Sequence, residues 1–406
     1  MIVAAGVAAA AAVAVLATPL ALAAAEPVRF VQDRFAISFW VDPPADKDMA
    51  AHYAEIVRAN FTVVMGNFGA STPAAVARQL ELCRKYDLKA LVAQAGLAPD
   101  KLPADKACWG YMLKDEPNVK DFPALKAQVA AIRKARPGKL AYTNLYPSYA
   151  SPTQLGVDRY ETYVQRFGSE VDIDVLCMDY YPHMTPERDT RDRYCENLAI
   201  MRRVSLERGI PFWNFFNTMP FGPHYDPTEA QLRWQIFTSL AYGAKGVLYF
   251  CYWTPKGREF PKGGAIITAE GRRTRHYDQS ARINAAVKNL GPVLMKLTST
   301  AVNRISPKDD PAAILKDAPI RNLTPGDYLV GVFTHADGRR AVLLNNYRHD
   351  YTAWPTVEFD IDPSQVMEVS QKNGQIAPVI DDSPAMEGLQ ISLDAGEGRL
   401  FLLPAK

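Results

Sequence analysis

Short apolar runs of strand length recur along the first two thirds of the chain, with polar and helical segments between them. Most are apolar throughout, which is typical of parallel strands covered on both faces. Their starts lie 20 to 36 residues apart, the spacing expected when each strand is followed by a helix and a short loop. The eight runs cover residues 35–40, 61–66, 89–94, 109–113, 140–145, 175–180, 211–216 and 246–253.

The intervening segments show helical periodicity. In residues 122–135, for example, Leu125, Val129 and Ile132 fall on one face of a helix. Similar patterns cover residues 46–58, 73–86, 192–208 and 227–241. Eight strand–helix units predict an α/β fold, a (β/α)8 TIM barrel. A doubly wound open sheet is the alternative, but it would leave the eighth strand without a partner, and the sequence has no GxGxxG turn.

Beyond Gly291-Pro292 the pattern changes to short strands separated by turns. The predicted strands are residues 328–334, 340–345, 356–360, 366–369, 389–393 and 398–403. They predict a small antiparallel β-sandwich domain after the barrel. The domain boundaries expected from the sequence are therefore 1–25 for a signal peptide, 26–295 for the barrel and 296–406 for the β-sandwich.

The first 25 residues contain no charged side chain and end in small residues before Glu26. This composition predicts a secretory signal peptide cleaved after Ala23 or Ala25, and therefore a secreted, periplasmic or cell-surface protein. No Lys or Arg follows Met1, so the true start lies upstream or the segment is an uncleaved membrane anchor. A membrane partner is expected only in that second case.

Charge and cysteine content exclude several kinds of partner. The chain has 46 Lys and Arg against 44 Asp and Glu and no basic run, so we expect no nucleic-acid partner. Its five cysteines are scattered, with no CxxC pair and no tight Cys/His cluster. Neither a metal cage nor a phosphate-binding loop is predicted, and no cofactor is required.

Candidate chemistry lies at the end of the fourth run, where residues 109–113 lead into Asp115, Glu116 and Pro117. Barrel strands project their C-terminal residues into a shared pocket, so these two carboxylates are candidate catalytic groups. The alternative is an acidic helix start, with Asp115 as an N-cap. Other strand ends carry aromatic, amide and carboxylate side chains of the kind that bind sugars, namely Trp40, Asn144, Asp179, Tyr180, Tyr181, Asn214 and Trp253.

These features together resemble the TIM-barrel glycoside hydrolases that carry a C-terminal β-sandwich. In the large clan of such enzymes, the acid/base Glu follows an Asn and precedes a Pro at the end of strand four. Glu116 occupies this position with Pro117 after it, and Trp253 matches the Trp that commonly floors the sugar site from strand eight. The resemblance implies a glycosidase in which Glu116 is the general acid and base.

Two departures from the clan pattern leave the partner of Glu116 open. Asp115 stands where the clan has Asn, and residues 212–218 offer no Glu at the position of the clan's nucleophile. An adjacent Asp-Glu pair is similar to N-acetylhexosaminidases, which implies that Asp115 orients the acetamide of the substrate. The other partner is Asp179, as nucleophile or base.

The sequence therefore predicts an exported glycosidase that acts on a poly- or oligosaccharide. The rival hypothesis is a barrel that binds glycans without cleaving them, or a cell-surface scaffold. A polysaccharide lyase or a metal-dependent deacetylase is a third alternative, but the strand ends do not clearly supply the residues that either chemistry needs.

Overall fold

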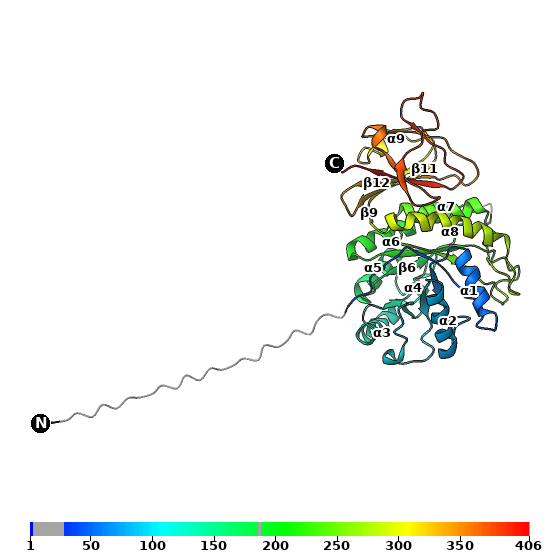
Figure 1. Ribbon diagram of the computed structural model, residues 1–406, viewed down its shortest axis with the longest axis vertical. Helices are drawn as coiled ribbons and strands as arrows, with labels where there is room; N and C mark the ends of the chain where they lie inside the picture. The colour runs from blue at the N-terminus through cyan, green and yellow to red at the C-terminus, as the bar shows by residue number, and fades with distance from the viewer. Residues whose placement is uncertain (3–27, 186–187, 406) are drawn as a thin grey trace.

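The computed structural model describes residues 1–2, 28–185 and 188–405, which form a barrel and a β domain stacked on it (Figure 1). The predicted signal peptide falls almost wholly on residues 3–25, outside the described part. Across the described ranges, no helix is long and apolar enough to cross a membrane.

The barrel contains eight parallel strands, and each predicted run overlaps one of them. Four strands pair in the order β1-β8-β7-β6, and the other four pair in the order β2-β3-β4-β5. The bounds are β1 Ala36–Phe39, β2 Val63–Met65, β3 Lys89–Val92, β4 Cys108–Met112, β5 Leu140–Tyr142, β6 Leu176–Asp179, β7 Phe212–Asn217 and β8 Gly246–Phe250.

Backbone contacts join the two four-stranded sheets at both of their edges. Leu145 forms an isolated parallel bridge with Met178, and its N–H donates to the Cys177 carbonyl at 2.9 Å. At the other edge, Thr62 N–H donates to the Ile37 carbonyl at 3.0 Å. The strands therefore follow one another around a closed ring in chain order, which confirms the predicted TIM barrel.

Helices surround this ring and are drawn from blue through yellow-green in Figure 1. They bury their apolar stripes against the strands, as the periodicity predicts. The bounds are α1 Met49–Arg58, α2 Pro73–Lys85, α3 Phe122–Ala135, α4 Pro152–Leu155, α5 Tyr160–Glu170, α6 Arg191–Arg208, α7 Glu229–Ala241 and α8 Arg275–Leu294, with short 3-10 turns η1 Pro99–Lys101 and η2 Val119–Asp121.

Large side chains fill the inside of the ring. Trp213 on β7 stacks on Trp109 of β4, with ring centroids 6.1 Å apart, and on Tyr142 of β5 at 5.9 Å. Phe30 packs edge-on against Trp109. Because these buried rings occupy the interior, a ligand has access to the ends of the strands and not to the centre of the barrel.

The C-terminal domain is an antiparallel β-sandwich. A six-stranded sheet has the order β15-β14-β17-β12-β11-β9, and a three-stranded sheet has the order β10-β13-β16. Strands β9, β10 and β15 were not predicted: polar positions interrupt the apolar pattern of β9 and β10, and β15 is an exposed strand of three residues that ends in a proline. The bounds are β9 Leu297–Ile305, α9 Pro311–Ile314, β10 Ile320–Leu323, β11 Tyr328–His335, β12 Arg340–Asn346, β13 Thr356–Phe359, η3 Pro363–Gln365, β14 Met367–Val369, β15 Ile376–Pro378, β16 Leu389–Gln390 and β17 Gly398–Leu403.

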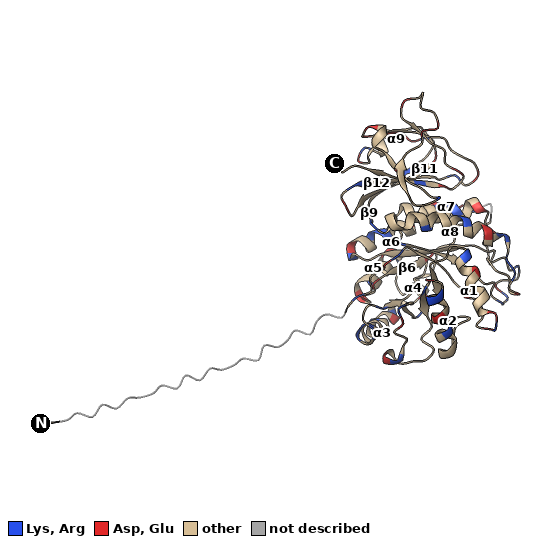
Figure 2. Cartoon of the chain, viewed as in Figure 1, with Lys and Arg blue, Asp and Glu red and all other residues tan. Residues whose placement is uncertain are grey.

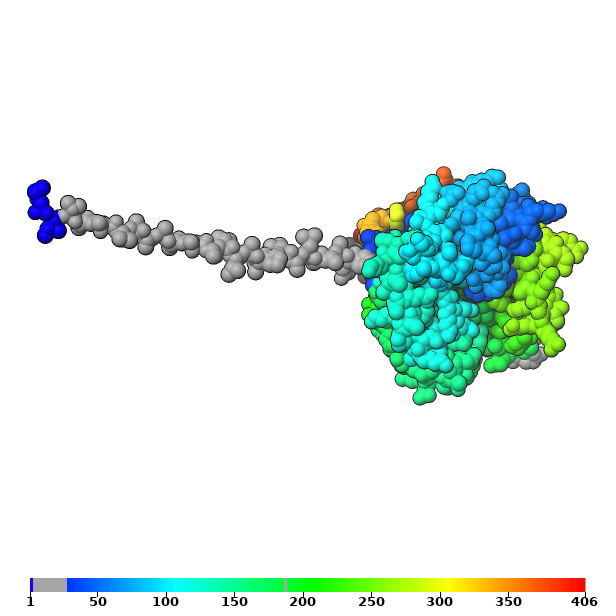
Figure 3. All heavy atoms as spheres, turned by 90° about the horizontal axis from the view of Figure 1, so that it is seen from below, coloured from blue at the N-terminus to red at the C-terminus, as the bar shows by residue number. Residues whose placement is uncertain are grey.

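Helix α7 lies between the barrel and the β domain (Figure 1). It contacts β7 on one side and β11 and β12 on the other, so most of its side chains are buried and it lacks a polar face. Asn345 of the β domain donates to the Phe237 carbonyl of this helix at 2.6 Å. Seen from below, the barrel hides most of the orange and red β domain (Figure 3). Basic and acidic residues are interspersed on the barrel helices (Figure 2).

Candidate active site at the carboxyl ends of the strands

A cavity of about 680 Å³ lies where the strands of the barrel end. This is the position at which TIM barrels place their active sites. Of the predicted site residues, six line it: Trp40, Asp115, Glu116, Asn144, Asp179 and Tyr181. A volume of this size accommodates one or two sugar rings.

The chain after β4 turns so that both carboxylates face this cavity. Glu116 has a left-handed backbone with φ of 46°, and its N–H donates to the Asn144 carbonyl at 3.0 Å. Such a conformation is costly for a residue other than glycine, and it is typical of functional sites where the surrounding structure enforces it. The cavity also includes Val41, a second non-glycine residue of this kind, with φ of 60°.

The neighbouring cation is directed away from the carboxylates. Lys114 Nζ donates to Asp121 Oδ2 at 2.7 Å, and the same oxygen accepts the Asn118 N–H at 2.9 Å. Asn118 and Asp121 thereby form a capping box that starts the following helical turn. The helix start that the sequence left as an alternative role for Asp115 is therefore provided by Asn118, three residues later.

Asp179 ends β6 beside the pair from β4. It is 6% exposed, and its Oδ1 accepts a hydrogen bond from Asn144 Nδ2 at 3.0 Å. Asn144 follows β5, so this amide lies between the ends of β4 and β6 and is in contact with carboxylates from both sides. The result is a cluster of carboxylates from the ends of β4 and β6, joined by an amide from the end of β5.

Burial raises the pKa values of all three carboxyl groups, and repulsion from neighbouring carboxylates adds to this for Glu116 and Asp179. Burial, followed by the charges of Asp179 and Asp115, raises the pKa of Glu116 to about 8. Burial and the charge of Asp115 raise the pKa of Asp179 to about 7, although the Asn144 hydrogen bond opposes this. Asp115 is accessible to solvent within the cavity, yet the protein atoms that crowd it raise its pKa to about 6. At neutral pH the cluster therefore holds both protonated and ionised carboxyls.

Aromatic rings form the walls around the cluster. Trp40 packs edge-on against Phe215 of β7 at 5.7 Å and against Phe68 at 5.4 Å. On the opposite wall, Tyr181 packs against Phe221 at 5.1 Å and against Phe250 at 5.2 Å. Apolar ring faces beside carboxylate and amide groups suit a sugar, which has apolar ring faces and a rim of hydroxyls.

Three of the predicted sugar-binding residues lie elsewhere. Asn214 is fully buried behind β7, where its Nδ2 donates to the hydroxyls of Tyr194 at 2.7 Å and Ser239 at 3.1 Å. Tyr180 is 1% exposed and packs against Tyr194 on the outer side of β6. Trp253 lines a second cavity beside helix α1. The position of the expected sugar-site floor on β8 is taken by Phe250, which lines the first cavity.

Other residues that line the first cavity come mainly from loops and were not predicted. They are Val41, Phe68, Tyr149, Met184, Arg188, Phe215, Phe221, Gly222, Pro223, His224, Phe250, Cys251, Pro255, Glu259 and Phe260. Phe215 and Phe250 lie within predicted strands. Each comes two residues after an inward-facing side chain of the same strand, so the alternation of side chains along a strand could have predicted that both face the cavity. Glu259 is an exposed carboxylate on the segment that follows β8.

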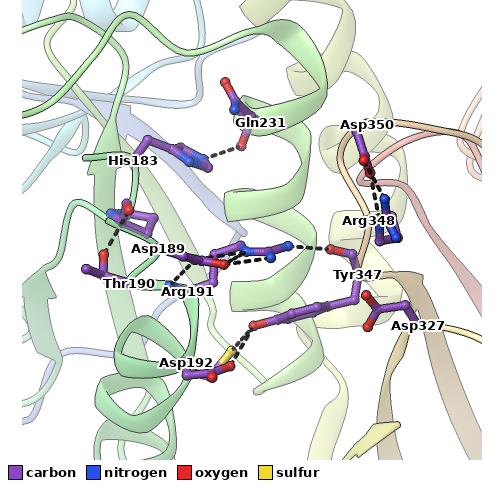
Figure 4. A network of polar contacts seen from close by, with 12 residues as sticks. His183, Asp189, Thr190, Arg191, Asp192, Gln231, Asp327, Tyr347, Arg348 and Asp350 are labelled. Carbon is purple, nitrogen blue, oxygen red and sulfur yellow. Dashed lines mark hydrogen bonds and ion pairs between the residues drawn. The ribbon is translucent and has the colours of Figure 1, made fainter. Parts of the chain in front are cut away.

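The loop between β6 and α6 connects the cavity to the β domain (Figure 4). On its inner side, Met184 bridges His224, and both line the cavity. On its outer side, Arg191 donates twice to Asp189, at 3.0 and 2.7 Å, and its Nη1 donates to the Tyr347 carbonyl of the β domain at 3.5 Å. The β domain is thus in direct contact with a loop that shapes the candidate site.

No group of three or more His, Cys, Asp and Glu side chains within residues 28–185 and 188–405 is arranged to hold a metal ion. The carboxyl cluster is held by an amide and by aromatic neighbours. Its geometry suits proton transfer between a carboxyl group and a substrate oxygen.

Comparison with known proteins places the fold. No family model and no curated protein sequence matches the chain. Among solved structures, a family 42 β-galactosidase from G. stearothermophilus is similar with a TM-score of 0.62 and 8% identity, covering 91% of this chain and 98% of that one. A β-galactosidase from Bacillus circulans sp. alkalophilus is similar with a TM-score of 0.57 and 10% identity, over 91% and 99% of the two chains.

A family 39 glycoside hydrolase from the gut symbiont Bacteroides cellulosilyticus WH2 is also similar, with a TM-score of 0.54 and 15% identity, covering 91% of this chain and 81% of that one. The chain therefore has the fold of the TIM-barrel glycoside hydrolases with a C-terminal β domain. This confirms the resemblance predicted from the sequence at the level of the fold.

Proposed function

We propose that the protein is an exported glycoside hydrolase that cleaves O-glycosidic bonds of a poly- or oligosaccharide. The observation that carries this proposal is the cluster of Asp115, Glu116 and Asp179 in an aromatic cavity, with pKa values raised to about 6, 8 and 7. The apolar composition of residues 1–25 supports export. The glycosidase fold supports the reaction class.

Glu116 is the general acid in this mechanism. Its raised pKa keeps it protonated at neutral pH, so it can donate its proton to the glycosidic oxygen as the bond to the anomeric carbon breaks. The position of Glu116 after β4 and before Pro117 also matches that of the acid in the resembling enzymes. While Glu116 keeps its proton it carries no charge, so a neighbouring carboxyl ionises more easily than it would beside a second carboxylate.

Asp179 acts on the opposite side of the sugar as nucleophile or base. The Asn144 amide stabilises the ionised form of Asp179. The charge of Asp179 raises the pKa of Glu116, so the loss of that charge on attack would lower the pKa of Glu116. Asp115 is the second candidate for this role, and it would then orient an acetamide of the substrate as the nucleophile. The accessibility of Asp115 within the cavity supports contact with substrate.

The test is hydrolysis of a panel of aryl glycosides, including N-acetylhexosaminides, by the protein and by Glu116→Gln, Asp179→Asn and Asp115→Asn. We expect Glu116→Gln and Asp179→Asn to lose activity by about a hundredfold or more. Glu259→Gln is the matched control, because it changes an exposed carboxylate on the same cavity, and we expect less than about threefold loss. Folding of each variant is checked by circular dichroism.

The configuration of the released sugar, followed by NMR, assigns the partner. Inversion identifies Asp179 as a base, and retention identifies a nucleophile. Retention that requires an N-acetyl group, with activity lost in Asp115→Asn, assigns the substrate-assisted route. Full activity of Glu116→Gln contradicts the proposal. Glycan binding without hydrolysis in any assay supports the rival function, a barrel that binds glycans without cleaving them.

A further inference from the structure

A second cavity, of about 540 Å³, lies at the rim of the barrel between helix α1 and the segment that follows β8. Figure 3 shows this region at one edge of the molecule, where the blue α1 segment lies beside the yellow-green segment after β8. Arg273 of the latter pairs with Glu55 of α1, so the two walls are held together by an ion pair. Both residues line the cavity.

Trp253 forms an aromatic wall of this second cavity. The indole is partly exposed, and His52 packs edge-on against it at 5.0 Å between ring centroids. Gly271 approaches the far end of the indole so closely that a Cβ there would lie 3.2 Å from the ring. Gly271 also has φ of 83°, so a larger residue would be strained at this position, and the loop keeps the ring in place without covering it fully.

A buried hydroxyl borders the same cavity without a partner. Tyr252 lines the cavity and is 1% exposed, and its hydroxyl has no hydrogen-bond partner in the described part of the chain. A buried polar group of this kind is costly unless something satisfies it. The ring of Tyr252 stacks on Phe39 at 4.5 Å between centroids and its hydroxyl is enclosed by protein atoms, so Tyr252 forms the buried back of the cavity behind Trp253.

The charges that line the cavity favour an uncharged ligand over an acidic one. Asp46, Asp48 and Glu270 supply carboxylate oxygens, whereas the single arginine of the lining is already paired with Glu55. Their negative charge would repel an acidic sugar or a phosphate. Carboxylates beside an indole face suit the hydroxyls and the apolar face of a neutral sugar.

The two cavities share their walls. Residues 40–41 and 250–251 line the first cavity, while Pro44 and residues 252–253 line the second. Tyr252 N–H donates to the Trp40 carbonyl at 2.9 Å, and Trp253 N–H donates to the Val41 carbonyl at 3.1 Å. The same pair of hydrogen-bonded segments thus forms the wall between the two cavities, which makes them neighbours at the rim of the barrel.

We propose that the second cavity is a distal binding site for a neutral glycan chain whose scissile bond lies in the first cavity. The partly exposed ring of Trp253 binds one sugar unit of this chain. The inference rests on the proposed function and narrows its substrate to an uncharged oligo- or polysaccharide long enough to occupy both cavities.

Calorimetric titration of the Glu116→Gln full chain tests this inference without turnover. The probes are cellohexaose, xylohexaose, mannohexaose and β-1,4-galactohexaose, each compared with its disaccharide. We expect at least one hexasaccharide to bind about tenfold or more tightly than its disaccharide. Adding Trp253→Ala removes this advantage, while the disaccharide affinity changes by less than about twofold.

Ala51→Trp is the second variant, because Ala51 is an exposed helix residue whose enlargement fills the cavity with little effect on folding. We expect it to remove the hexasaccharide advantage as Trp253→Ala does. A hexasaccharide advantage that survives both variants overturns the inference, as does the absence of binding by all four hexasaccharides. The titration measures binding and not cleavage. Its result therefore tests the distal site even if the hydrolysis assays show no activity.

Discussion

The side-chain amide of Asn144 donates to Asp179 Oδ1 at 3.0 Å, and this contact joins the ends of β5 and β6 beneath the candidate acid. The same residue accepts the Glu116 N–H at its backbone carbonyl, at 3.0 Å. Asn144 therefore holds the acid through its main chain and the opposing carboxylate through its side chain. Its position makes it the residue that sets the geometry and the charge balance of the cluster.

Replacing Asn144 by Ala should shift the pH dependence of the reaction. The amide hydrogen bond favours the ionised form of Asp179, so its loss raises the pKa of that carboxyl further above about 7. We expect the acidic limb of the pH profile of kcat/KM to move upward by about one unit and activity at pH 7 to fall by about tenfold. The measurement is kcat/KM on an aryl glycoside between pH 5 and 9.

Asn214→Ala is the matched control for this experiment. Asn214 is an asparagine within strand β7, and it bonds to Tyr194 and Ser239 behind the barrel wall. Its replacement should lower the free energy of unfolding by about 1 to 3 kcal/mol and leave the acidic limb unmoved. An unchanged limb in Asn144→Ala would show that its amide does not control Asp179.

The contrast between Asn144 and Asn214 also shows what the sequence could predict. Both lie in apolar runs that were predicted as strands. Membership of such a run does not by itself tell which of the two faces the cavity. On β7, Trp213 and Phe215 face the interior, so the residue between them faces the helices. The strict alternation of side chains therefore excludes Asn214, and the same argument places Tyr180 behind Asp179 and Tyr181.

The cavity residues that lie on loops could not be predicted from the alternation of side chains along a strand. Phe221, Phe260 and Tyr149 lie on connections whose paths depend on tertiary packing, and Trp253 lies three residues past the end of β8. By contrast, the eight strands were predicted because a parallel strand covered on both faces is apolar throughout. Strand β9 was missed because Thr298 and Thr300 on one of its faces are exposed, and the polar Ser299 and Asn303 interrupt the apolar pattern of the other face.

Neutral replacements of the clustered carboxyls should stabilise the protein at alkaline pH. The folded state raises the pKa of Asp179 from its ordinary value to about 7, so it holds a proton that the unfolded chain releases near pH 4. The free energy of unfolding therefore falls as the pH rises through this window. We expect Asp179→Asn to exceed the parent by about 2 to 3 kcal/mol at pH 8.

This gain should shrink toward zero as the pH falls to about 4 and below, where the carboxyl of the parent protein becomes neutral in both states. Urea denaturation of the two proteins at pH 4, 6 and 8 measures it. A gain that does not depend on pH would mean that Asp179 is ionised in the folded protein without cost. Glu116→Gln should behave in the same direction, because the pKa of Glu116 is also raised.

The histidines at the domain interface should make the protein sensitive to acid (Figure 4). His183 is 3% exposed, its Nε2 donates to the Gln231 carbonyl at 3.4 Å, and His349 of the β domain packs edge-on against it at 5.6 Å. Burial, followed by the charges of His349 and Arg191, lowers the pKa of His183 to about 3, despite the opposing charge of Asp189. Tyr225 contributes a neutral hydroxyl at Nδ1.

Because His183 stays neutral in the folded protein, the unfolded chain binds the extra proton below about pH 6.5, and stability is lost as the pH falls toward 3. Between pH 6.5 and 4.5 this residue alone should lower the free energy of unfolding by about 2 to 3 kcal/mol. We expect His183→Gln to be less stable at pH 7 but to lose correspondingly less on acidification, as measured by urea denaturation at closely spaced pH values. An equal loss of unfolding free energy in both proteins would mean that the acid-sensitive group is not His183. The variant His349→Gln then tests the partner ring, because burial and the charge of Arg191 also lower the pKa of His349.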